Sequence, residues 1–128
     1  MAGFSRVDEA LQAVRDMHRD LLMLGSRQSV SLTLKASMHV GACLAVNAND
    51  RLDFFGTAIN LAARMLSCCR GGDLAVSEEI FERREMAEFL KGLPAPPELS
   101  EFRFRGFSVP RRVGRIPMTA AVSGSPRD

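Results

Sequence analysis

The stretch Arg51-Leu-Asp-Phe-Phe-Gly-Thr-Ala-Ile-Asn-Leu-Ala-Ala-Arg-Met65 decides how the rest of the chain is interpreted. Gly56 opens a segment with helical apolar spacing, and this spacing predicts a helix over about residues 57–69. We expect the packed stripe of this helix to consist of four apolar residues, Ile59, Ala62, Ala63 and Leu66. Asn60 and Arg64 are four positions apart, so they share another face. One face is therefore predicted to pack, while the other presents an amide and a guanidinium.

These polar groups have a chemistry that suits a nucleotide. The Arg64 guanidinium is permanently charged and forked, which fits phosphate oxygens, and the Asn60 amide can bond a ribose. Asp53, just before the glycine turn, can accept a hydrogen bond from an exocyclic amine. Spacing alone leaves a plainer alternative open, in which Asn60 and Arg64 face solvent and Asp53 is a turn residue.

Upstream of this stretch, the pattern predicts a helix, a strand and a hairpin. Ser5 is the expected cap of a helix whose natural stop is Gly25, because apolar residues recur between them at three-to-four spacing. Over residues 30–40 the apolar period changes to two, which predicts a strand. Residues 42–46 form a short second strand, and the polar run 47–50 is the expected turn of a hairpin.

Downstream, Gly71 and Gly72 are expected to end the central helix. A short strand over residues 74–76 follows, and Ser77 is the expected cap of a helix that runs to about Leu90 with a solvated acidic face. The three prolines within residues 91–100 predict a surface loop. Two late strands are expected over residues 101–107 and 109–116, and the tail from Thr119 is expected to be frayed.

The composition indicates one globular domain. The 128 residues are 46% hydrophobic and 25% charged, and their formal net charge of +2 is too small to indicate a nucleic-acid or membrane partner. No apolar run approaches the roughly 18 residues that a membrane-spanning helix needs. We therefore expect a cytoplasmic chain without a membrane segment. The three cysteines are expected to be reduced, because their spacing fits neither a disulfide framework nor a metal site.

The central motif resembles the signature of class III adenylyl and guanylyl cyclases. The pattern Asp-x-x-Gly-x-x-x-Asn-x-Ala-x-Arg is present as Asp53, Gly56, Asn60, Ala62 and Arg64. Three flanking segments are also similar to family elements: 38–41 to a strand-to-glycine element, 71–77 to the strand after the helix, and 104–107 to a Lys-Gly segment, with Arg105 in place of lysine. The resemblance implies an α+β fold, a partial ferredoxin-like cyclase domain with helices packed on a mostly antiparallel sheet. We expect this truncated domain to span residues 1–118 and a flexible tail to span 119–128.

The resemblance also implies roles for individual residues. Asp53 is expected to read the adenine amine, Asn60 to orient the ribose, and Arg64 to stabilise charge that develops on the phosphate. The family converts a nucleoside triphosphate to a 3′,5′-cyclic monophosphate and pyrophosphate, with Mg²⁺ or Mn²⁺ held by two aspartates. Aspartate at position 53 favours ATP over GTP as the nucleotide.

The sequence departs from the family pattern at its N-terminal side. The family's metal-binding aspartates lie on an early strand and a following hairpin, and neither motif is present. Asp8, Asp16 and Asp20 fall in the first predicted helix, where they are expected to be solvated. We therefore expect no metal ligand in the chain, a sheet without its first strands, and a homo-oligomer or a partner chain that completes the sheet and the site.

Whether the chain is an enzyme stays open from the sequence. One hypothesis is the C-terminal portion of an adenylate cyclase, inactive alone. The alternative is a pseudo-cyclase module that dimerises with a partner and regulates it without chemistry.

The remaining polar residues give weaker signals. His18 and His39 are expected to be structural or at the surface, and Cys68-Cys69 has no neighbour that would activate a thiolate. Five arginines near the end can contact phosphate or nucleic acid, but a solvated sheet face is the favoured interpretation: Arg103, Arg105, Arg111, Arg112 and Arg115. Nucleic-acid binding would be sensitive to salt, and we expect none.

Overall fold

The computed structural model describes residues 2–41, 44–48 and 51–119, with the backbone alone for 44–48 and 51–55. A four-stranded sheet has the order β1-β4-β6-β5. Its strands are β1 (Lys35–Met38), β4 (Asp73–Ser77), β5 (Glu98–Phe102) and β6 (Arg111–Pro117). β1 and β4 are parallel, and the other two pairs are antiparallel. The predicted α+β class with a mostly antiparallel sheet is confirmed.

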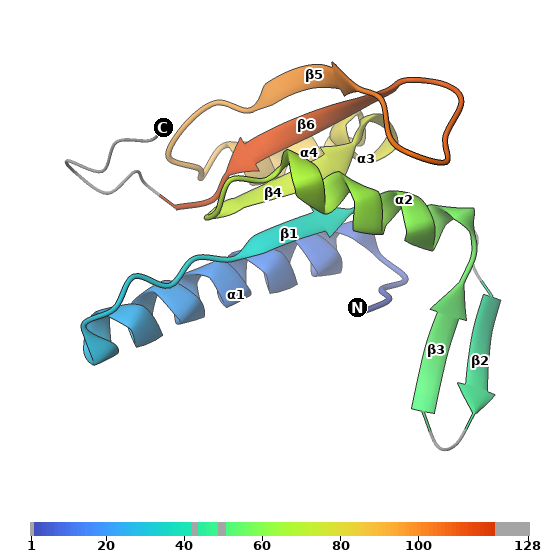
Figure 1. Cartoon of the computed structure of the whole chain (residues 1–128). Coiled ribbons are helices and arrows are strands. Elements are labelled where there is room, and N and C mark those ends of the chain that lie inside the picture. The colour runs from blue at the N-terminus through green and yellow to red at the C-terminus, as the bar shows by residue number, and fades with distance from the viewer. Residues whose placement is uncertain (1, 42–43, 49–50, 120–128) are drawn as a thin grey trace.

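A separate antiparallel hairpin projects away from the sheet (Figure 1). It consists of β2 (Leu44–Ala48) and β3 (Arg51–Phe55), paired from Leu44 with Phe55 to Ala48 with Arg51. The predicted hairpin is confirmed, although its first strand extends to Ala48, two residues beyond the predicted end. Ala42 and Cys43 of the expected strand, and residues 49–50 of the expected turn, lie outside the described residues.

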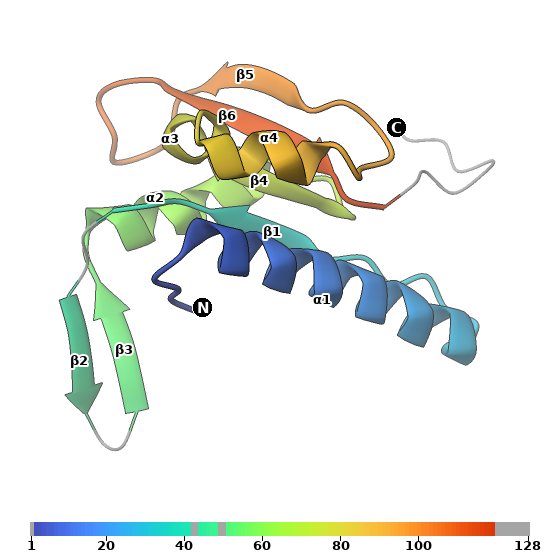
Figure 2. The ribbon, with the colours of Figure 1, turned by 180° about the vertical axis from the view of Figure 1, so that it is seen from behind.

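Helices cover both faces of the sheet (Figures 1 and 2). One face carries α1 (Val7–Gln28), α3 (Glu78–Phe81) and α4 (Arg84–Leu90), and the other carries α2 (Thr57–Met65) with a 3₁₀ turn at Leu66–Cys68. Alternate side chains of a strand point to opposite faces. The two resulting cores contain Leu11, Val14, Leu74, Val76, Met86, Phe89 and Ile116 on the α1 side, and Leu61, Met65, Ala75, Phe104 and Val113 on the α2 side.

Helix α1 is longer than the sequence predicted. Arg6, not Ser5, is the N-cap, and the helix continues through Gly25 to Gln28, where Ser29 adopts a left-handed conformation with φ 58°. The predicted stop at Gly25 is therefore wrong. Gly25 is buried, and a Cβ atom there would lie 2.7 Å from the backbone oxygen of Val30. The glycine allows the chain to fold back against its own helix.

Strand β1 is shorter than the predicted strand over residues 30–40, because only residues 35–38 lie opposite β4. The predicted alternation is confirmed within it. Ala36 and Met38 pack on the α1-side core, while the Ser37 hydroxyl on the opposite face donates to the carbonyl of Ala62 in α2. This strand is one edge of the described sheet.

The C-terminal half differs from its prediction in its boundaries. The expected helix from Ser77 to about Leu90 breaks into α3 and α4 at residues 82–83. β5 begins at Glu98, within the expected loop, and residues 103–110 connect it to β6. The late strands are thus shifted from 101–107 and 109–116 because Phe104 turns inward and is buried under α2. Thr119 donates its N–H to the carbonyl of Gly72, so it is not frayed, and residues 120–128 of the expected tail lie outside the described part.

Buried polar groups tie α1 and the turn before β4 together. His18 is 3% exposed, with Nδ1 2.9 Å from the Val14 carbonyl oxygen and Nε2 3.1 Å from that of Asp73. The buried Asp73 carboxylate accepts the backbone N–H groups of Arg70 and Gly71 and an N–H of Arg115. His18 is therefore structural, as predicted.

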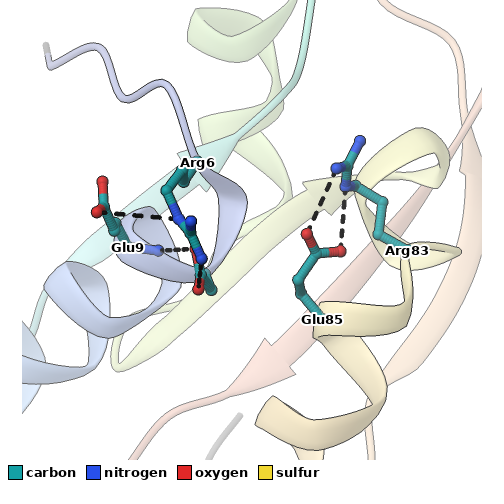
Figure 3. A network of polar contacts seen from close by, with 5 residues as sticks. Arg6, Glu9, Arg83 and Glu85 are labelled. Atoms are coloured by element: carbon teal, nitrogen blue, oxygen red, sulfur yellow. Dashed lines mark hydrogen bonds and ion pairs between the residues drawn. The ribbon is translucent and has the colours of Figure 1, made fainter.

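Exposed ion pairs mark the N-terminal ends of α1 and α4 (Figure 3). Arg6 contacts Asp8 and Glu9, and Arg83 contacts Glu85. Asp16 and Asp20 also lie at the surface, where both pair with Arg19. Such solvated pairs contribute little to stability, typically below about 1 kcal/mol. None of the described helices combines the length and apolar character needed to cross a membrane.

The close approach at Gly25 gives a stability prediction. Replacing a helical glycine by alanine ordinarily stabilises a helix by about 1 kcal/mol. We expect Gly25→Ala to destabilise the protein instead, by about 1–3 kcal/mol, because the added methyl meets a backbone oxygen that cannot easily move. Urea unfolding measures the change. Ser26→Ala, at the exposed neighbouring position, is the control and should be neutral or stabilising; a stabilised Gly25→Ala variant would contradict the prediction.

Candidate functional site

Gly56 sets the position of α2 relative to the hairpin. Its φ of 144° and ψ of 167° belong to a backbone region that residues other than glycine rarely adopt. Its carbonyl accepts the N–H of Asn60 at 3.2 Å, so the first turn of α2 begins directly at the end of β3. Asp53 pairs with Val46 in the hairpin, three residues before this turn. The Asp53 side chain lies outside the description, so its relation to the nucleotide stays a prediction.

Helix α2 packs through a different stripe from the one predicted. Leu61 and Met65 are buried, at 2% and 0% exposure, and Cys68 continues the line in the 3₁₀ turn. The predicted stripe is wrong, because Ala63 and Leu66 are exposed and Ile59 and Ala62 are only partly buried. The bulkier Leu61 and Met65 fill the space against Ala75, Phe104 and Val113. Asn60 and Arg64 are exposed, which confirms that they leave the packed face together.

Asn60 and Arg64 line a pocket of about 470 Å³ between α2 and the connection from β5 to β6. Its other lining residues are Thr57, Ala63, Arg105, Gly106 and Phe107. This connection is fixed in place by Phe104, whose side chain is buried and whose carbonyl accepts the N–H of Phe107. Gly106 has a φ of 88°, and this left-handed turn brings Arg105 and Phe107 to the same pocket.

The terminal arginines separate into two groups. Arg111 pairs with Glu79, and Arg112 pairs with Glu78. Arg115 pairs with both Asp73 and Glu98, and all four N–O distances lie between 2.8 and 3.1 Å. The pairs of Arg111 and Arg112 with the acidic start of α3 lie at the surface, in agreement with the predicted solvated faces, whereas the Arg115 side chain is only 15% exposed and departs from the prediction. Arg105 lies at the pocket instead. Sequence reasoning missed Thr57, Arg105 and Phe107; the Phe104-Arg-Gly-Phe107 turn was the available signal for the last two.

The donors around this pocket suit an anion. They comprise two guanidinium groups, one amide and one hydroxyl, and no carboxylate is among the described lining residues. Mg²⁺ prefers carboxylate, carbonyl and water oxygens and is repelled by two fixed positive charges. The described residues of this pocket therefore do not fit a divalent cation, and they do fit phosphate oxygens, which guanidinium groups bind in bidentate geometry.

Comparison with known protein families identifies the family of most of the chain. The family model for the adenylate and guanylate cyclase catalytic domain matches residues 5–93. The chain belongs to this family. The match includes the hairpin, Gly56 and α2, while β5 and β6 lie beyond it. The comparison with curated proteins gave no match.

Solved cyclase structures share the fold of this cyclase domain. The guanylyl cyclase Cya2 superposes with a TM-score of 0.63 at 19% identity over 91% of this chain and 61% of its own. An adenylate/guanylate cyclase/hydrolase from Silicibacter pomeroyi gives 0.63 at 18% identity over 88% of this chain and 63% of its own. The adenylyl cyclase CyaB from P. aeruginosa gives 0.57 at 19% identity over 94% and 64%. The chain thus spans somewhat under two thirds of these proteins.

His39 directly follows β1 in this cyclase domain. Its Nδ1 lies 2.7 Å from the hydroxyl oxygen of Ser77, the residue that precedes α3. Burial lowers the pKa of His39, the charge of Glu79 opposes this and that of Arg111 adds to it. The contact joins two neighbouring strands of one sheet, so His39 is structural, as predicted.

The cysteines after α2 are also structural. Cys68 and Cys69 are both free and buried. Burial raises the pKa of the Cys69 thiol to about 12, helped by the nearby Asp73 carboxylate, and burial also raises the pKa of Cys68. An activated thiolate, by contrast, needs a lowered thiol pKa.

The raised pKa of Cys69 predicts slow alkylation. A thiol with a pKa of about 12 is far less ionised at pH 8 than a free thiol with a pKa near 8.5, by roughly a thousand-fold. Iodoacetamide at pH 8 should therefore modify Cys69 at least about 100-fold more slowly in the folded protein than in urea. Peptide mass analysis resolves Cys68-Cys69 from Cys43. Equal rates in the folded and unfolded protein would contradict the assignment.

Proposed function

We propose that this chain supplies the ribose- and phosphate-binding side of a shared nucleotide cyclase site. The observation that carries the proposal is the single pocket lined by Asn60, Arg64 and Arg105. Two of these residues come from the cyclase motif on α2, and the third comes from a connection 41 positions further along the chain. Membership of the cyclase family, whose match includes α2, supports the part of the assignment that concerns Asn60 and Arg64.

Each residue has a role that follows from its chemistry. The forked guanidinium of Arg64 binds phosphate oxygens and stabilises the charge that develops during phosphoryl transfer. Asn60 holds the ribose through its amide, which both donates and accepts hydrogen bonds. Arg105 adds a second positive charge for the triphosphate, and Asp53 reads the adenine amine. The product of the reaction is 3′,5′-cyclic AMP, with pyrophosphate as the leaving group.

The carboxylates that hold Mg²⁺ or Mn²⁺ are expected from another chain. β1 is an edge of the described sheet, which leaves one side of its backbone available for pairing. Helix α1 lies beside it and exposes Met17 and Leu24 at 49% and 45%. A second chain that adds a strand to β1 and packs on α1 covers both features. A second copy of this chain can cover these features as a homo-oligomer, but the carboxylates must come from a different cyclase chain that keeps its metal-binding aspartates and reaches the pocket on the α2 side.

Complementation tests this division of labour. The purified chain with ATP and Mn²⁺ should form no cyclic AMP. Activity should appear when it is mixed with a cyclase chain that keeps its metal-binding aspartates but has alanine at its own counterparts of Asn60 and Arg64. Arg64→Ala in the present chain should then lower kcat by about 100-fold or more, because one charge-stabilising donor is lost.

Arg103→Ala is the matched control for this experiment. Arg103 is exposed and is not among the pocket residues, so this variant should keep the activity of the mixture. Robust turnover by the purified chain alone would contradict the division of labour. An Arg64→Ala variant as active as Arg103→Ala would contradict the role of Arg64.

Base selection gives a separate prediction. Asp53→Asn replaces a carboxylate acceptor by an amide whose oxygen accepts and whose nitrogen donates. We expect the preference for ATP over GTP in kcat/KM to fall by about ten-fold or more, because lost charge-assisted hydrogen bonds cost about 1.5–3 kcal/mol. Competition between the two nucleotides in the complemented mixture measures the ratio. An unchanged ratio would remove Asp53 from base recognition.

A second candidate function is regulatory. The same edge of β1 and the same exposed apolar positions of α1 suit association without chemistry. In this case the chain forms a stable complex with a cyclase chain and changes its activity, while Arg64→Ala has no effect. Sedimentation together with the activity assay separates the two functions.

A further inference from the structure

A second pocket, of about 410 Å³, lies on the opposite side of the sheet from Asn60 and Arg64. Its lining residues come from α1, from the segment that follows α4 and from the residues directly after β6. Its walls are apolar and consist of Leu22, Leu93, Pro94 and Met118. Arg15, Arg19 and Thr119 supply the polar groups. The motif on α2 does not contribute to it.

The Arg15 guanidinium is held in a fixed position in this pocket. One of its NH₂ groups donates to the carbonyl of Phe89 at 3.1 Å, and its central carbon lies 4.8 Å from the centre of the Phe89 ring. Gly92 lies next to the guanidinium, and a Cβ atom at this position would be in van der Waals contact with it, 3.4 Å from an Arg15 NH₂ nitrogen. A guanidinium has five N–H donors, and within the described part of the chain one group of Arg15 takes part in a hydrogen bond.

The two arginines of the pocket differ in their partners. Arg19 pairs with Asp16 at 3.2 Å and with Asp20 at 3.4 Å. Within the described part of the chain, no carboxylate forms an ion pair with Arg15; its one hydrogen bond goes to a neutral carbonyl. A fixed guanidinium next to apolar walls and without a counterion is a place where an anion with an apolar body binds well.

We propose that this pocket binds a small organic carboxylate, whose carboxylate group pairs with Arg15 and whose hydrocarbon part lies against Leu22, Leu93 and Met118. Carboxylate fits better than phosphate because Arg19 is already paired with Asp16 and Asp20, which leaves Arg15 as the guanidinium without a carboxylate partner in the described part of the chain, while a hydrocarbon chain gains from burial against the apolar wall. The site is separate from the nucleotide pocket, so the proposal holds whether or not the chain takes part in cyclisation.

A ligand at this position bridges α1 and the segment after α4. α1 and α4 pack together through the core that contains Leu11, Val14, Met86 and Phe89, and Leu93 of the following segment packs against the same core. Binding therefore stabilises the layer that covers the sheet opposite α2. The same ligand raises the unfolding temperature, since it binds only the folded arrangement.

The test is an NMR titration of the isotope-labelled full chain with acetate, butyrate, hexanoate and inorganic phosphate at constant ionic strength. We expect hexanoate to shift the amide signals of Leu22, Gly92, Leu93 and Thr119. The dissociation constant should fall about three- to four-fold for each methylene that becomes buried. Phosphate should bind more weakly than hexanoate. Tighter binding of phosphate, or equal affinity for acetate and hexanoate, would overturn the carboxylate assignment.

Variants locate the binding. Arg15→Gln should weaken hexanoate about ten-fold or more through the loss of the charged fork. Gly92→Val keeps Arg15 but covers it, and should weaken binding similarly, so a folding defect of one variant does not decide the result. Arg27→Gln, at an exposed arginine of the same helix, and Arg64→Gln, in the nucleotide pocket, should leave the affinity unchanged. Binding that survives both pocket variants, or that is lost in Arg64→Gln, would overturn the site.

Discussion

Strand β4 is buried at all five of its positions, and the other elements are arranged around this constraint. Leu74 and Val76 point to the core beneath α1, α3 and α4, while Ala75 points to the core beneath α2. A strand covered on both faces must have neighbours on both edges to satisfy its backbone groups, and β1 and β6 provide them. The turn that leads into β4 is fixed by the Asp73 carboxylate, which accepts two backbone N–H groups and pairs with Arg115. Both pockets therefore lie on elements that β4 holds in place.

Local patterns in the sequence predicted the elements that depend on short-range physics. The two-residue period around Ala36 and Met38, the hairpin before Gly56 and the glycine pair before β4 follow from side-chain alternation and turn chemistry. Asn60 and Arg64 could be placed together because helical spacing alone puts them on one face. The packed stripe of α2 could not be predicted from the sequence, because Ile59 and Leu66 are as apolar as Leu61 and Met65. The packed side is chosen by the position of Phe104 and Val113, which lie at least 38 positions further along the chain.

The remaining differences have the same kind of cause. Gly25 has the sequence signature of a helix end, but the returning backbone at Val30 needs the space that a side chain would fill. Arg105 sits in an alternating run that favours a strand, but burial of Phe104 and the left-handed Gly106 turn the chain toward α2. Tertiary contacts overrode local preference at both positions. Arg105 consequently became a pocket residue, although its spacing indicated a solvated face.

The charge of the pocket beside Asn60 and Arg64 gives a physical reason for the proposed sharing of the site between chains. Arg64 and Arg105 line one pocket with Asn60, and no carboxylate is among the lining residues described. Two guanidinium groups that share a pocket repel each other until an anion enters between them. A triphosphate relieves this repulsion, and so does a partner surface that carries carboxylates. In the proposed assembly, partner and nucleotide therefore bind to the same excess of positive charge. The cations held by the partner neutralise the phosphates of the nucleotide from the opposite side. Partner binding should therefore strengthen nucleotide binding, and nucleotide binding should strengthen partner binding. On this basis, assembly of the site and capture of its substrate are coupled by electrostatics.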